Sequence, residues 1–134
     1  MEKFLALPFK IDEVFEGFAE VDGLININKS SLIMEFQTRD AIFGVIKSNV
    51  KKVVLNAEDL IEIKVKKNWF SANMIIVANT FLAGKGLPKA TGNELVLEIK
   101  KKDLDTAMQI ASLMNMKISE IRLNYAENIS QQEK

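Results

Sequence analysis

Residues 94–116, ELVLEIKKKDLDTAMQIASLMNM, decide the fold because the spacing of their apolar side chains changes at Lys102. Before Lys102 every second residue is apolar, which is the period of a half-buried β-strand. After Asp103, a residue type that favours helix N-caps, the apolar residues recur at helical spacing. The predicted helix face consists of Leu104, Ala107, Met108, Ala111, Met114 and Ile118, widened by Ile110 and Leu113. A last strand followed at once by one amphipathic helix, near 103–117, is therefore expected.

The region upstream, about residues 18–100, alternates apolar and polar residues in short runs that predict antiparallel hairpins. We expect a turn at Asn28-Lys29-Ser30, a bulge at Asp22-Gly23 and a polar, frayed tail at 124–134, although Ile118, Ile121 and Tyr125 would allow a longer helix. Residues 41–50 read as a strand end or as a loop packed onto the core. The predicted strands cover 18–27, 32–37, 52–55, 60–66, 73–79 and 94–100, with one weak edge strand at 80–83 inside an irregular loop at 80–93.

The fold class that follows is mainly β, or α+β by count, with about seven antiparallel strands and one C-terminal helix. A chain of 134 residues is expected to form a single domain over 1–134. It contains no His and no Cys, which excludes thiolate and imidazole metal sites, disulfides and nucleophiles that need a His base. We therefore expect no enzyme activity, no catalytic residue, no metal and no cofactor.

Charge is balanced overall, with 18 basic and 18 acidic residues, but it is uneven along the chain. Residues 1–40 carry eight acids and four bases, residues 41–102 carry eleven bases and five acids, and residues 103–134 carry five acids and three bases. The basic middle is almost purely Lys, which lacks the bidentate fork of Arg. It is read either as a set of solvated strand faces or as an anion-binding surface.

The N-terminus has only a short apolar patch before Lys10, Asp12 and Glu13, so it does not resemble a secretory signal. The longest uncharged stretch, 68–84, is interrupted by polar residues and is too short for a bilayer span. A cytoplasmic location is expected.

The order and spacing of several segments resemble the small bacterial pleckstrin-homology-like (PH-like) domains. These segments are DGLININKSSLIMEF (22–36), FGVIKSNVKKVVLNAEDLIEIKVKK (43–67), NWFSANMIIVAN (68–79), ELVLEIKKKDLDTA (94–107) and the helix AMQIASLMNM (107–116). The resemblance implies a PH-like, partly open barrel of about seven antiparallel strands in two packed sheets, whose open end the C-terminal helix plugs. It also implies a binding module of uncharacterised function rather than an enzyme. Phosphoinositide-binding relatives carry several basic residues at the first hairpin, where this chain has only Lys29, so head-group recognition there is not expected.

Trp69 and Phe70 follow Lys66 and Lys67 at an expected hairpin tip, and these four are the candidate binding residues. Adjacent residues of a strand point to opposite faces, so at most one of the two aromatic side chains would be buried. Trp69 either lies over the end of the barrel as part of the core or serves as an exposed anchor.

Other candidate motifs are weak. Gly84-Lys85-Gly86 is followed by Leu87-Pro88 and does not match a phosphate loop. The Lys100-Lys101-Lys102 run could follow nucleic-acid phosphates, but specific nucleic-acid binding is not expected from a neutral chain without an aromatic ladder. The expected function is protein–protein interaction or self-association, with a protein partner or a second copy. The alternative is peripheral binding to an anionic membrane surface through the Lys-rich strands and Trp69-Phe70.

Overall fold

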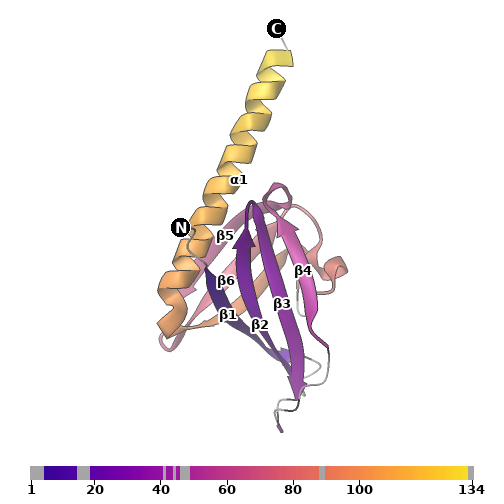
Figure 1. The fold of residues 1–134 in the computed structure, drawn as a ribbon, viewed down its shortest axis with the longest axis vertical. Coiled ribbons are helices and arrows are strands. Elements are labelled where there is room, and N and C mark those ends of the chain that lie inside the picture. Colours follow the sequence, from indigo (N-terminus) through magenta and orange to yellow (C-terminus); the bar gives the residue numbers. More distant parts are fainter. Residues whose placement is uncertain are drawn as a thin grey trace.

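The computed structural model describes residues 5–14, 19–40, 42–43, 45, 49–87 and 90–132 (Figure 1). Seven strands and a long helix make up most of these segments. The strands are β1 (Ala6–Val14), β2 (Ala19–Asn28), β3 (Ser31–Asp40), β4 (Lys51–Asn56), β5 (Leu60–Lys67), β6 (Ser71–Ala78) and β7 (Glu94–Lys100). The helix is α1 (Leu104–Gln132), and three short 3-10 turns are η1 (Ala57–Asp59), η2 (Leu82–Lys85) and η3 (Lys101–Asp103).

The strands form one antiparallel sheet in the order β4-β3-β2-β1-β7-β6-β5. Strands β1 and β7 are joined by a single ladder position, Lys10 opposite Glu98, whereas the other neighbours pair over much longer stretches. No pairing joins β4 to β5, so the sheet curls without closing (Figure 1). This confirms the predicted class of a mainly β, partly open arrangement of about seven antiparallel strands followed by one C-terminal helix.

The core follows from the alternation of the strands, since alternate residues share one face. Leu95, Leu97 and Ile99 of β7 are fully buried, and their neighbours point outward. All other strands contribute to the same cluster, and the helix covers it with Ala107, Ile110, Ala111, Met114 and Ile118. No polar or charged residue is buried among the described residues, so the hydrophobic effect is the main driving force for this fold.

Strand β1 was not predicted, because the predicted strands began at residue 18. Its inward residues, Leu7, Phe9 and Ile11, are buried and alternate with the outward Pro8 and Lys10. The strand occupies the centre of the sheet, between β2 and β7. The predicted edge strand at 80–83 is wrong: part of that stretch is the turn η2, and Leu82 and Leu87 bring the connection down onto the core.

The bulge predicted at Asp22-Gly23 is absent, and β2 keeps a regular register through both residues. Gly23 is instead required by packing, because it lies opposite Phe9 on the inner face. A Cβ atom at Gly23 would collide with the Phe9 ring and would lie 2.7 Å from the carbonyl oxygen of Glu35. The turn predicted at Asn28-Lys29-Ser30 is confirmed, and Lys29 there has a positive φ of 56°.

Helix α1 is much longer than the predicted 103–117, and residues 124–132 of the expected frayed tail are helical. Ile118 and Ile121 keep contact with the core, and the rest of the helix projects beyond the sheet (Figure 1). Met108, predicted on the buried face, is instead 54% exposed because its position lies about 100° from Ala107 around the helix. Within the described residues, no helix combines the length and apolarity that crossing a membrane requires.

Candidate functional site

The turn between β5 and β6 carries the two aromatic residues singled out in the sequence. Trp69 is 81% exposed and Phe70 is 85% exposed, which overturns the interpretation of Trp69 as a core residue. Both lie in the turn rather than in a strand, so the rule of opposite faces does not apply to them. Their rings pack edge to face, with centroids 6.3 Å apart and an interplanar angle of 76°.

Hydrogen bonds define this turn. The backbone N–H of Asn68 donates to the carbonyl oxygen of Ser71 at 2.8 Å, which closes the hairpin. The side chain of Lys101 donates to the carbonyl oxygen of Trp69 at 3.2 Å, although Lys101 is 32 residues away in the sequence. The tip is thereby linked to the junction between β7 and α1.

Four exposed lysines accompany the two aromatics. Lys66 and Lys67 end β5, which runs one residue beyond the predicted strand at 60–66. Lys101 and Lys102 belong to η3. They lie next to this turn because the preceding residue, Lys100, pairs with Ser71 at the start of β6. We call the group the tip patch: Lys66, Lys67, Trp69, Phe70, Lys101 and Lys102. Sequence reasoning noted the lysine run at 100–102 but did not place it here, since that placement needs the β6–β7 register.

A second group of charged residues lies on the outer face of the central strands. Arg39 and Asp22 form an ion pair at 3.0 Å, and Lys10 lies opposite Asp22 on one side and opposite Glu98 on the other. An open hollow of about 330 Å³ is lined by Pro8, Phe9, Lys10, Asp22, Gly23, Arg39, Glu98 and Lys100. Cationic and anionic side chains alternate along this face and largely compensate each other. The face therefore favours neither an anionic nor a cationic ligand.

Glu98 has a clearly changed pKa. A hydrogen bond with Asp12 raises the pKa of the Glu98 carboxyl, helped by burial and by the negative charge of Asp12, while Lys10 acts in the opposite direction. The folded chain therefore holds this proton more tightly than the unfolded chain, so the pair favours folding at low pH and this contribution is lost as pH rises through the folded pKa. Two carboxyls alone do not form a metal site, and no cluster of three potential ligands occurs among the described residues.

A third feature lies in the connection between β3 and β4. Residues 41–50 were expected to end a strand or to pack on the core. Residues 41, 44 and 46–48 lie outside the described residues, and of the rest Ile42 is 73% exposed and Phe43 is 80% exposed. Strand β3 ends at Asp40, so the alternation of inward and outward residues no longer applies beyond it. The sequence alone does not show whether the apolar residues that follow pack inward or project outward.

The tip patch is thus the most distinctive site on the described surface, and its chemistry is that of an apolar anchor among cations. Comparisons of the chain with protein-family models, with curated proteins and with solved structures gave no match.

Proposed function

We propose that this chain is a non-catalytic binding module built on a PH-like barrel. Support comes from the chain order of seven antiparallel strands, the sheet order in which β1 joins two hairpin-connected halves, and the helix that follows β7 directly. In such a scaffold, binding is expected at loops and turns that the rigid sheet positions. The tip patch has this kind of placement.

The best supported target is an anionic membrane surface. One observation carries this proposal: Trp69 and Phe70 are both more than 80% exposed, follow Lys66 and Lys67 in the same hairpin, and receive a hydrogen bond from Lys101 at the Trp69 carbonyl. Tryptophan favours the membrane–water interface, where its amphipathic ring lies at head-group level. Each nearby lysine adds about 1 kcal/mol of attraction to an anionic leaflet, and this attraction weakens with salt.

A vesicle co-sedimentation assay tests the proposal. We expect the chain to pellet with phosphatidylcholine vesicles that contain phosphatidylserine, to pellet less at high salt, and to stay in solution with phosphatidylcholine alone. Trp69→Ala should lower the membrane partition coefficient on the order of tenfold, because an inserted aromatic side chain contributes roughly 1.5–3 kcal/mol to the free energy of binding. Its thermal stability should stay within about 0.5 kcal/mol of the parent, as for other exposed sites.

Leu123→Ala provides the matched control, since Leu123 is also an exposed apolar residue but lies on the projecting part of α1. It should pellet like the parent chain. Equal binding of the Trp69→Ala variant and the parent would contradict the proposal.

A second candidate function is protein–protein interaction or self-association, and the projecting helix favours it. Leu123, Tyr125 and Ile129 are apolar or aromatic residues on a segment that no other part of the described chain covers. Light scattering tests this candidate: a strict monomer at high concentration would argue against self-association.

A further inference from the structure

The two borders of the sheet, β4 and β5, differ in how they are covered. At β5 the helix α1 packs along the strand, and the Asn115 side chain hydrogen-bonds to the backbone of Ile63. Strand β4 pairs with β3 and, among the described elements, packs extensively against no other (Figure 1). The outer edge of β4 can therefore accept another strand.

The pairing with β3 determines which backbone groups of β4 point outward. The N–H of Ala57 donates to the carbonyl oxygen of Ser30 at 2.8 Å, so these two residues are a hydrogen-bonded pair next to the end of β4. Hydrogen-bonded and non-hydrogen-bonded pairs alternate along an antiparallel ladder. No hydrogen bond among the described residues uses the outward N–H and C=O groups. These groups belong to every second residue: Lys52, Val54 and Asn56.

The side chains of β4 match each other when two copies run antiparallel around Val54. In that register Val54 lies opposite Val54 of the second copy, and Val53 lies opposite Leu55. Lys52 lies opposite Asn56. Apolar residues then meet apolar residues on both faces of the joined sheet, which stabilises cross-strand pairs. Val54 is 43% exposed in the single chain, and the pairing would cover it.

The charges along β4 favour the same orientation. Lys51 and Lys52 are exposed at the start of the strand. Glu58 and Asp59 lie in η1, directly after its end. Antiparallel pairing brings the basic start of each copy next to the acidic end of the other. Parallel pairing would instead bring like charges together at both ends.

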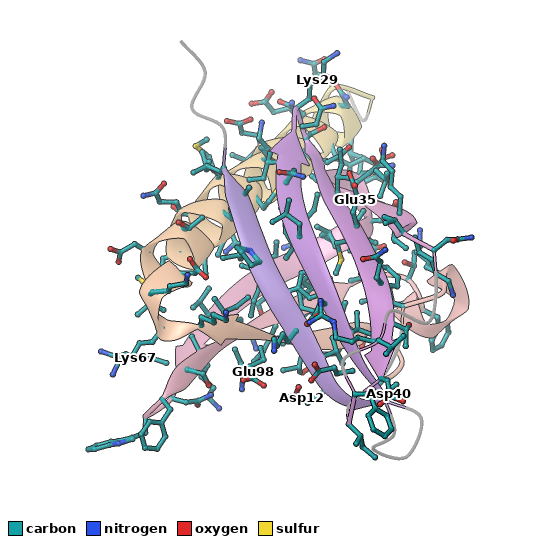
Figure 2. All side chains as sticks on the ribbon, turned by 60° about the horizontal axis from the view of Figure 1, so that its bottom comes forward. Asp12, Lys29, Glu35, Asp40, Lys67 and Glu98 are labelled. Atoms are coloured by element: carbon teal, nitrogen blue, oxygen red, sulfur yellow. The ribbon has the colours of Figure 1, made fainter. Side chains whose placement is uncertain are left out.

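The lysines also restrict the register. Lysine on an edge strand usually opposes pairing with another strand. Here Lys52 has an acidic neighbour in its own chain, because Glu35 lies opposite it on β3, the strand on which Figure 2 labels Glu35. Around Val54, Lys52 meets the uncharged Asn56, whereas a register centred on Lys52 would set two lysines opposite each other. The lysines therefore select one register rather than prevent pairing.

We propose that two copies of this chain associate through β4, antiparallel around Val54, so that their sheets continue into each other. This inference rests on the second candidate function, self-association, and assigns it to the border of the sheet instead of the projecting helix. The contact uses the same surface of both copies, so it closes at a dimer. Growth through the other border is blocked, because α1 covers β5.

A single introduced cysteine tests the contact and its register. The chain contains no cysteine, so Val54→Cys carries one thiol. Opposed residues of a hydrogen-bonded antiparallel pair have Cα atoms about 5.5 Å apart, which a disulfide can span. We expect a disulfide-linked dimer on a non-reducing gel after mild oxidation. Val96→Cys is the matched control, since Val96 is 44% exposed but lies on β7, inside the sheet. It should stay monomeric.

Analytical ultracentrifugation without vesicles measures the association itself. We expect the parent chain to form a dimer as its concentration rises. Val54→Pro removes an N–H that points away from β3, so the variant should fold like the parent by circular dichroism. Its dimer should be weaker on the order of tenfold, because two intermolecular hydrogen bonds are lost.

A charge exchange tests the orientation without proline. Lys52→Glu should weaken the dimer, because it places an acid next to the acidic η1 of the other copy. Lys52→Glu/Glu58→Lys should restore the dimer, since opposite charges meet again. Failure of the double variant to recover would contradict the antiparallel arrangement.

The outcomes separate this inference from the functions proposed above. If Val54→Pro associates like the parent and Val54→Cys cross-links no more than Val96→Cys, the chain self-associates through another surface and the β4 contact is wrong. If the parent is a strict monomer at high concentration, self-association fails as well. Neither result depends on vesicles, so membrane binding is tested independently.

Discussion

Gly23 shows how a single residue fixes the close packing of the sheet. Because a Cβ at this position would overlap the Phe9 ring and crowd the Glu35 carbonyl, Gly23→Ala should destabilise the fold by about 1–3 kcal/mol. Chemical denaturation measures this change. In a Phe9→Leu background the same substitution should cost less, by at least about 0.5 kcal/mol, since the ring is no longer there to collide. Equal losses in both backgrounds would place the strain at the carbonyl instead.

Asn115 protects the exposed edge of strand β5. The sheet ends at β5, and its outer edge would expose free N–H and C=O groups. The Asn115 side chain accepts from the N–H of Ile63 and donates to its carbonyl oxygen, both at 2.8 Å, in the manner of a neighbouring strand. Arg122 also donates to the carbonyl oxygen of Ile61 at 3.2 Å. Helix α1 therefore covers the edge as well as the core.

Removing this contact should loosen β5. We expect Asn115→Ala to cost about 1–3 kcal/mol of stability, because two part-buried backbone groups lose their partner. Hydrogen exchange of the Ile63 amide should accelerate in parallel. Asn124→Ala, at an exposed position of the same helix, is the control and should leave both measurements unchanged. If the two variants behave alike, water replaces the Asn115 amide at no cost.

The elements also show what the sequence could predict. The change of period at Lys102 located β7 and the start of the helix, because a strand and a helix expose their apolar faces at different spacings. The end of α1 could not be found in this way, since residues 122–131 are all exposed and no apolar contact marks their helical state. Strand β1 was missed for a related reason: its alternation is short, and only its pairing with β2 and β7 makes it central.

Part of the candidate site could be predicted from the sequence, and part could not. Trp69, Phe70, Lys66 and Lys67 were accessible from the sequence because they are neighbours in one hairpin. Lys101 and Lys102 join them only through the pairing of β6 with β7, and the exposure of Ile42 and Phe43 depends on the turn at Asp40. Contacts between residues far apart in the sequence determine these features, so local sequence patterns do not reveal them.

At the scale of the whole molecule, the curled sheet and the projecting half of α1 are separable parts. Tyr125 and Ile129 continue the buried stripe of the helix, but they are exposed because the sheet ends near Ile121. Removal of residues 124–134 should therefore change stability by no more than about 0.5 kcal/mol, while removal from Lys117 onward, which deletes the buried Ile118, should cost at least about 2–5 kcal/mol. Thermal melts followed by circular dichroism measure both changes. The shorter truncation keeps the tip patch, so it should bind anionic vesicles like the full chain. Loss of vesicle binding in a stable truncated chain would instead assign the interaction to the projecting helix.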